Sequence, residues 1–236
     1  PGEKAAHPNS RFCTPISQCP ILSNEFYDPK GVPVDAIIFG GRRENTIPLV
    51  SQSRNWQHGV FMGATCSSET TAAAKGAVGV LRRDPMAMLP FIGYHVGDYF
   101  KHWIGLSERT TPDKLPKVFY VNWFRRDSEG KFLWPGFGEN SRVLKWIVER
   151  LEGRVEAIEK GETDIDPTYS IRLDQTNIEG LNISDEHLEQ VLRYVPNEWA
   201  DELPRVRRWL RSLGLKVPQE IHDELWHIAM NIIGER

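Results

Sequence analysis

The sequence predicts an α/β fold in which a mixed sheet is followed by a helical C-terminal tail. Two short apolar runs, at 34–39 and within 115–124, have the composition of strands. Three later segments carry helix start signals and apolar helical spacing; they begin near Ser184, Asn197 and Pro218. We therefore expect one α/β lobe over residues 1–153 and a helical tail over 154–236 that packs on the same lobe.

Composition and charge restrict the class of protein. The 236 residues are 40% hydrophobic and 26% charged, as in a globular protein with ample material for a core. The net charge of -3 argues against a general nucleic-acid binder. No apolar run approaches the length of a membrane span, and nothing at the N-terminus resembles a signal peptide. Cys13, Cys19 and Cys66 form no C-x-x-C pair, which argues against a disulfide framework or zinc site and favours a reducing, cytoplasmic setting.

The first 20 residues should form a loop, because Pro15 and Pro20 interrupt regular structure. The chain begins at Pro1 without a methionine, and we expect it to be a portion of a longer polypeptide. Arg11 is a candidate for binding a carboxylate or phosphate, since a guanidinium donates two parallel hydrogen bonds to such groups. A solvated surface arginine is the alternative.

The apolar run 34–39 ends at Gly40 and Gly41, as expected of a buried strand that enters a tight turn. Arg42 and Arg43 follow this turn. Side chains just past the carboxyl end of a strand commonly face a ligand crevice in α/β folds. A pair of solvated arginines is an equal alternative.

Residues 56–63 are apolar enough for a further strand. His58 lies within this run, and a histidine side chain titrates near neutral pH. A lone histidine between Gln57 and Gly59 is more often a hydrogen-bonded structural residue, and we expect that role here.

Residues 67–79 change abruptly to small side chains with no large apolar anchor. Such a segment buries too little surface to fix itself in place, so we expect it to be mobile or only conditionally ordered, with an exposed alanine-rich helical turn as the alternative. A proline-bracketed turn at 84–91 follows, and then a helix near 98–106. The aromatic side chains around this helix are expected in the core; they are Tyr94, Tyr99 and Trp103.

Residues 121–144 hold five large aromatic side chains: Trp123, Phe124, Phe132, Trp134 and Phe137. This stretch is also rich in glycine and proline, so most of these rings should lie on a loop rather than on one helix or strand. Asn140 ends the loop and, with Ser141, can cap the helix predicted over 143–151. Rings that stack on a base and an amide that reads its edge suit a purine site, and burial in the core is the alternative.

The run F-L-W-P-G-F-G-E-N-S-R-V-L resembles a signature in the C-terminal part of the GTP-dependent phosphoenolpyruvate carboxykinases. The resemblance extends from about Asn9 to Gly153, through N-S-R, I-I-F-G-G-R-R and S-E-T-T-A-A-A, and is weak beyond Gly153. It implies a nucleotide-binding lobe in which three phenylalanines hold guanine and an asparagine recognises its edge. The implied nucleotide-binding residues are Arg11, Arg42, Phe124, Phe132, Phe137, Gly138, Glu139 and Asn140.

The resemblance also implies roles around the substrate. Asn9, Ser10, Arg11 and Phe91 would bind it, although the family often has a second phenylalanine where this chain has Ile92, which leaves open whether position 91 or 92 faces the ligand. Arg11 and Arg42 would be catalytic, because cations offset charge on the transferring phosphoryl group. An active-site lid would span Glu69 to Gly79, and its matching residues are Glu69, Thr70, Thr71, Ala72, Ala73 and Ala74.

An enzyme of this family would be a lyase and kinase that converts oxaloacetate and GTP to phosphoenolpyruvate, carbon dioxide and GDP in gluconeogenesis. The resemblance implies a cytoplasmic monomer with a divalent metal, Mn²⁺ together with Mg²⁺. The family's metal ligands, phosphate cradle and reactive cysteine belong to segments upstream of the match, and this sequence has no G-x-x-x-x-G-K-[ST] loop. We therefore expect no metal ligand in this chain, the upstream polypeptide as its partner, and no activity of the chain alone. A non-catalytic GTP-binding module and a purely structural domain are the alternatives.

Overall fold

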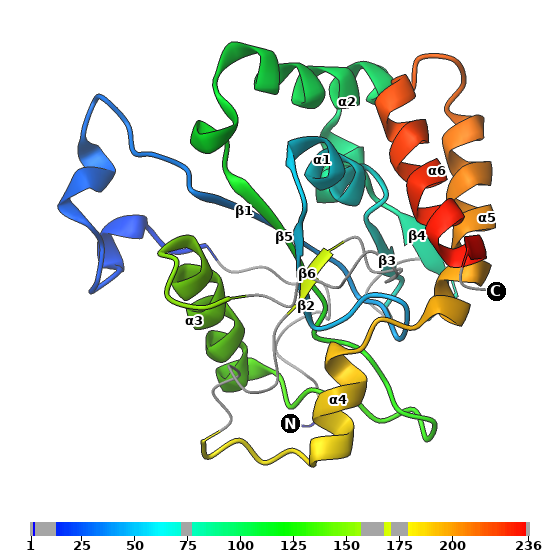
Figure 1. The fold of residues 1–236 in the computed structure, drawn as a ribbon. Coiled ribbons are helices and arrows are strands. Elements are labelled where there is room, and N and C mark those ends of the chain that lie inside the picture. Colours follow the sequence, from blue (N-terminus) through cyan, green and yellow to red (C-terminus); the bar gives the residue numbers. More distant parts are fainter. Residues whose placement is uncertain (1, 3–12, 72–76, 157–167, 171–178, 235–236) are drawn as a thin grey trace.

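The computed structural model describes residue 2 and residues 13–71, 77–156, 168–170 and 179–234. A four-stranded mixed sheet in the order β1-β5-β2-β6 lies at its centre (Figure 1). Strand β1 pairs in parallel with β5, and β2 pairs antiparallel with β5 and β6. The strand bounds are Ala36–Gly40 for β1, Val50–Ser53 for β2, Lys117–Val121 for β5 and Thr168–Ser170 for β6. The predicted α/β fold with a mixed sheet is confirmed.

Helices lie on both faces of this sheet. Their bounds in the described part of the chain are Trp56–Ala64 (α1), Val96–Gly105 (α2), Asn140–Leu151 (α3), Asp185–Leu192 (α4), Pro196–Ser212 (α5) and Gln219–Gly234 (α6). A separate antiparallel hairpin joins β3 (Ser67–Glu69) to β4 (Leu81–Arg83). Short 3-10 helices complete the described structure: Ile16–Gln18 (η1), Asn24–Tyr27 (η2), Pro85–Ala87 (η3), Leu89–Phe91 (η4), Leu106–Arg109 (η5), Pro112–Lys114 (η6) and Phe137–Glu139 (η7).

The sheet separates two apolar clusters, because successive side chains of β5 point to opposite faces. Val118 and Tyr120 belong to the cluster formed with α1, α2, α5 and α6. Phe119 and Val121 belong to the cluster formed with α3 and α4. Figure 1 shows the same division, with α3 and α4 on one side of the sheet and the other four helices on the opposite side. The C-terminal helices thus contribute to both layers of the core.

The segment 56–63 is a helix, and the predicted strand is wrong. Helix α1 is buried around nearly its whole circumference, so its apolar residues follow one another without helical spacing, as in a buried strand. The missed signal was Asn55, whose side chain caps the helix by accepting a hydrogen bond from the His58 backbone N–H at 2.8 Å. A Cβ on Gly59 would lie 2.5 Å from Val118, so this glycine permits the close approach of α1 to β5.

His58 is structural, as expected. Its side chain is buried, and its Nδ1 accepts a hydrogen bond from the Arg54 backbone N–H at 3.2 Å. Burial, reinforced by the positive charge of Arg54, lowers the pKa of His58 to about 3. The imidazole is therefore neutral at physiological pH.

The strands predicted at 34–39 and within 115–124 are present as β1 and β5, and the helix predicted near 98–106 is present as α2, each with shifted bounds. Strand β1 is less buried than expected, since Ile38 is exposed and only Phe39 is fully buried. Tyr99 and Trp103 pack against the core, as predicted, whereas Tyr94 is exposed, so its expected burial is wrong. Tyr94 precedes the first turn of α2, and its ring is arranged edge-to-face with that of Tyr99, with 6.2 Å between the centroids.

The C-terminal helices have the predicted signals. Ser184 caps α4, because its Oγ accepts a hydrogen bond from the His187 backbone N–H at 3.2 Å. Helix α5 begins at Pro196 and continues without interruption past Pro204. The predicted apolar face of α6 is buried, and it consists of Ile221, Leu225, Ile228 and Ile232. Within the described residues, no helix combines the length and apolar character needed to cross a bilayer.

Candidate functional site

The turn that follows β1 is joined closely to the β3–β4 hairpin. The Arg42 backbone N–H donates to Ser68 Oγ at 3.1 Å, and the Glu69 backbone N–H donates to the Arg42 carbonyl at 2.9 Å. The Arg42 side chain adds a third bond, from Nε to the Glu69 carbonyl at 3.0 Å. A Cβ on Gly41 would lie 2.1 Å from the Ser67 carbonyl oxygen, so only glycine allows this approach.

Arg43 points into the protein, which excludes the solvated pair considered from the sequence. Its Nη1 lies 3.1 Å from Glu202 Oε1 on α5, and Nη2 of Arg83 on β4 lies 2.8 Å from the same oxygen. Arg43 Nη1 also donates to Ser67 Oγ at 2.7 Å. Burial lowers the pKa of the Arg83 guanidinium, and the negative charge of Glu202 opposes that shift. One buried carboxylate therefore holds the turn after β1 and both strands of the hairpin.

Sequence reasoning missed Glu202 and Arg83. One signal was present: Glu202 precedes Val206 by four positions and Leu210 by eight, so it lies on the buried stripe of α5. A glutamate on a buried stripe needs a cationic partner, which here comes from distant segments. The tail therefore contributes a buried ion pair as well as apolar packing.

Thr46, further along the same turn, has strained backbone geometry. Its φ is 69°, an outlier for a β-branched residue, and the side chain is buried. Glu198 of α5 accepts a hydrogen bond from the Thr46 backbone N–H at 2.6 Å and pairs with Arg125 at 3.2 Å. Helix α5 therefore stabilises the strained turn through Glu198 as well as through Glu202.

The described part of the predicted lid begins on this hairpin. The Thr70 backbone N–H donates to the Val80 carbonyl and the Gly79 backbone N–H donates to the Thr70 carbonyl, each at 2.9 Å. Glu69 Oε1 accepts from the Glu44 backbone N–H at 2.7 Å. The expectation that the segment 67–79 cannot fix itself in place is wrong for its first residues, because Ser67 is fully buried and β3 is paired with β4. Ala72, Ala73 and Ala74 lie outside the described residues.

The turn after β4 is also strained and leads to Phe91. Met86 and Ala87 are consecutive non-glycine residues with positive φ, 53° and 54°. Phe91 is 76% exposed, whereas Ile92 packs against the core. Of the two positions left open by the sequence, 91 is the one that presents its side chain to solvent.

The aromatic loop starts with a hairpin over residues 125–133. The Leu133 backbone N–H donates to the Arg125 carbonyl at 2.8 Å, and the backbone N–H groups of Glu129 and Lys131 both donate to Asp127 Oδ1 at 2.9 Å. These two bonds to the carboxylate, with that from Lys131 the stronger, hold the pKa of Asp127 below its usual range. The hairpin fixes the position of the ring at 132.

Phe124 and Phe132 are neighbours, and they stand apart from the core. Their ring centroids lie 5.9 Å apart in an edge-to-face arrangement, and Phe132 is 51% exposed. The Arg126 guanidinium lies 4.1 Å from the centre of the Phe132 ring and covers one of its faces. A base stacking on Phe132 would therefore use the opposite face or displace Arg126.

Phe137 combines strain with full exposure. Its φ is 46°, and its side chain is 99% exposed. A large aromatic residue held in the left-handed region costs of order 1–3 kcal/mol, and here no burial offsets that cost. By contrast, Trp134 is buried in the cluster with α3 and α4. The alternative of burial in the core therefore holds for Trp134 and not for the exposed rings of Phe132 and Phe137.

Asn140 is the first residue of α3 and does not cap it. Its Oδ1 instead accepts a hydrogen bond from Trp134 Nε1 at 2.9 Å. Glu139 forms an ion pair with Arg142, and a Cβ added to Gly138 would meet no atom within 4 Å. Phe124 and Phe132 thus form one pair of neighbouring rings, and the residues 137–140 stand at the exposed start of α3.

The structure leaves part of the predicted site undescribed. Asn9, Ser10 and Arg11 lie outside the described residues. Within the described part of the chain, no group of three or more His, Cys, Asp or Glu side chains is arranged to hold a metal ion. A cavity of about 40 Å³ lies beside Glu202, His58 and Trp199, but it is much too small for a nucleotide.

The fold and these surfaces define the class of the protein. A mixed sheet flanked by helices, a cationic turn past the carboxyl end of β1 and an exposed aromatic loop are typical of nucleotide-binding α/β domains. The family model described as "Phosphoenolpyruvate carboxykinase C-terminal P-loop domain" matches residues 1–230. The chain therefore belongs to this family, and the match extends well beyond Gly153, where the recognisable motifs end.

Curated relatives agree with the family model. The protein named phosphoenolpyruvate carboxykinase [GTP] in Paenarthrobacter aurescens is 55% identical over 94% of this chain and 36% of its own length. Proteins of the same name in Renibacterium salmoninarum and Corynebacterium jeikeium are each 56% identical over 94% of this chain and 36% of their own length. The chain thus spans about a third of the length of the curated relatives it matches.

Proposed function

We propose that the chain is the guanine-binding C-terminal portion of a GTP-dependent phosphoenolpyruvate carboxykinase. The complete enzyme would convert oxaloacetate and GTP to phosphoenolpyruvate, carbon dioxide and GDP in gluconeogenesis. Family membership and the names of the relatives support the reaction. The observation that carries the guanine site is the exposure of Phe132 and of strained Phe137 on the loop that ends at the fixed amide of Asn140. Phe124, Gly138 and Glu139 complete the proposed nucleotide-binding set.

Arg42 would act on the phosphates. Within the described residues its side chain uses only Nε, in the bond to Glu69, so both terminal nitrogens remain available to a phosphate group. Decarboxylation of oxaloacetate yields an enolate whose oxygen attacks the γ-phosphorus, and the bond from that phosphorus to GDP breaks. Arg42 and Arg11 would stabilise the charge on the transferring group. Asn9, Ser10 and Phe91 would bind the organic substrate.

The segment 69–79 would close over the substrate as a lid and keep water from protonating the enolate. Its attachment to Arg42 through Glu69 supports this role, because closure and the position of the phosphate-binding arginine would then be linked. We also propose that residues 1–153 and 154–236 act as one lobe, since α5 and α6 share the cluster of α1 and α2.

The family implies a divalent metal, with Mn²⁺ and Mg²⁺ as candidates. The described residues do not fit such an ion, and we assign no step of the reaction to it through this chain. This chain covers only 36% of the length of these relatives, which supports our placing the metal ligands and a phosphate cradle in an upstream part of the same polypeptide. We further propose a cytoplasmic monomer whose isolated C-terminal portion does not turn over substrate.

Replacing Phe137 by alanine should weaken GDP binding by tenfold or more, because a stacked ring contributes about 1–3 kcal/mol per base. The thermal midpoint should not fall, since the side chain is 99% exposed. Isothermal titration with GDP measures the first effect and thermal denaturation the second.

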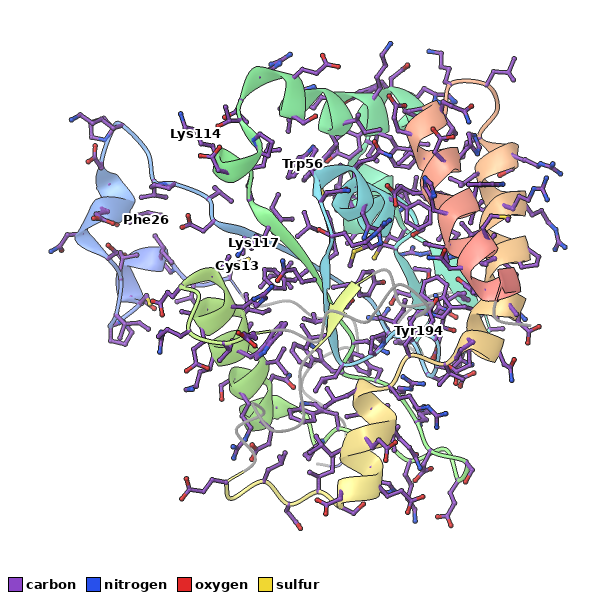
Figure 2. All side chains as sticks on the ribbon, in the orientation of Figure 1. Cys13, Phe26, Trp56, Lys114, Lys117 and Tyr194 are labelled. Atoms are coloured by element: carbon purple, nitrogen blue, oxygen red, sulfur yellow. The ribbon has the colours of Figure 1, made fainter. Side chains whose placement is uncertain are left out.

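Phe26→Ala is the matched control, because Phe26 is also an exposed phenylalanine on a short 3-10 helix. Figure 2 shows Phe26 on the outlying N-terminal segment. Equal GDP affinity of the Phe137 and Phe26 variants would show that the aromatic loop is not part of the nucleotide site. If the full-length protein binds GDP but does not form phosphoenolpyruvate, the chain belongs instead to a non-catalytic GTP-binding module.

A further inference from the structure

The bond between Trp134 and Asn140 joins the core to the proposed base-binding surface. Trp134 is 1% exposed and packs in the cluster with α3 and α4. Its Nε1 donates to Asn140 Oδ1 across 2.9 Å, and Asn140 itself is half-buried at the start of α3. The indole is fixed by packing on all sides, so it provides a rigid reference for the amide.

The chemistry of the indole decides which way the amide faces. An indole N–H only donates a hydrogen bond, so the atom of Asn140 that it meets must be the carbonyl oxygen. Turning the amide over would place the Nδ2 donor against the indole donor and leave both unpaired, which is costly in a partly buried position. Within the described residues Asn140 Nδ2 makes no hydrogen bond, and Asn140 Oδ1 keeps a second lone pair beside the one that accepts from Trp134.

The fixed amide therefore presents a donor and an acceptor in one defined order. Guanine carries the complementary pair on its edge, with O6 accepting and N1–H donating. Adenine carries the opposite pair, with its 6-amino group donating and N1 accepting, and would pair only with the reversed amide. We propose that Trp134 is a positioning residue for base specificity, which selects guanine over adenine by preventing the Asn140 amide from turning over. This inference rests on the proposed function, in which the base lies at Asn140.

Trp134→Phe keeps an aromatic ring in the core and removes the N–H. In the full-length protein that carries this chain, the ratio of the ADP to the GDP dissociation constant should fall by about tenfold, because the amide can then turn over. Part of the fall should be a gain in ADP affinity, which a simple loss of structure would not produce. Isothermal titration with each nucleotide gives both constants.

Trp146→Phe is the matched control. Trp146 is a buried tryptophan of the same cluster, and its Nε1 has no hydrogen-bond partner among the described residues. This variant loses the same indole volume from the same core, so any general effect of repacking should appear in it equally. We expect its ADP-to-GDP ratio to match that of the unaltered protein.

A second variant tests the proposal if the Trp134 variant does not fold. Asn140→Asp keeps an oxygen for the indole and replaces the outward donor by an acceptor, so GDP should lose its preference over ADP. An unchanged ratio in a folded Trp134→Phe variant would overturn the proposal while leaving the base at Asn140. An undiminished GDP preference in Asn140→Asp would overturn it by removing Asn140 from the base. Failure of the guanine site as a whole is a different result, because the unaltered protein would then show no preference for GDP.

Discussion

Glu202→Gln is expected to lower the free energy of unfolding by about 3 kcal/mol, the loss typical of a buried ion pair that loses one partner. The substitution preserves shape and removes the charge that Arg43 and Arg83 share, so two buried guanidinium groups would remain without a counterion. Urea denaturation measures the loss. Hydrogen exchange at the Glu69 backbone amide should also accelerate, because Arg43 and Arg83 hold both strands of the hairpin to α5.

Asp201→Asn is the control for this prediction. Asp201 is the neighbouring acidic residue of α5, it is exposed, and it forms no ion pair within the described residues. Its replacement should change the free energy of unfolding by no more than about 0.5 kcal/mol. If both variants lose the same small amount, Glu202 does not hold the turn and the hairpin together.

Gly41→Ala is expected to cost about 3 kcal/mol of stability and to reduce turnover by the full-length enzyme more than tenfold. The added Cβ would lie 2.1 Å from the Ser67 carbonyl oxygen, and a backbone atom cannot move aside without shifting β3. The shift would break the bonds from Arg42 to Ser68 and Glu69, so the arginine would lose its position. Chemical denaturation and steady-state kinetics of the variant measure the two effects.

Gly105→Ala provides the comparison, because a Cβ at the end of α2 would meet no atom within 4 Å. This change should leave stability unaltered or raise it by up to about 1 kcal/mol, since alanine is the better helix former. A Gly41 variant with the stability and turnover of the Gly105 variant would show that the contact between the turn and β3 is not required.

The elements with clear local signals were predictable from the sequence. Helix α3 and the buried face of α6 follow from apolar spacing, which reflects one buried face per helix, and strand β5 follows from a short apolar run that is buried on both faces. Helix α1 was misassigned because it is buried on nearly every side, and a continuous apolar run does not distinguish a helix from a strand. The exposure of Phe91 over Ile92 depends on the strained turn after β4, which has no glycine to signal it.

The parts of the site that depend on distant partners were not predictable in this way. Glu202 meets Arg43 across 159 positions of the sequence, and the Glu198 bond to Thr46 spans 152. Such pairs become visible only when the fold brings their elements together. The role of Asn140 changed for the same reason: its side chain was a plausible helix cap by position, but the buried indole of Trp134 takes its oxygen.

The most direct test of the guanine site is a titration of the intrinsic tryptophan fluorescence of this chain with GDP and, separately, with ADP. Trp134 donates its hydrogen bond to the residue proposed to read the base, so occupancy of the site should alter its emission. We predict saturable quenching by GDP at concentrations at least about tenfold below those needed for ADP, as one discriminating pair of hydrogen bonds allows. Equal responses to the two nucleotides, or no response to either, would contradict a guanine site formed by this chain.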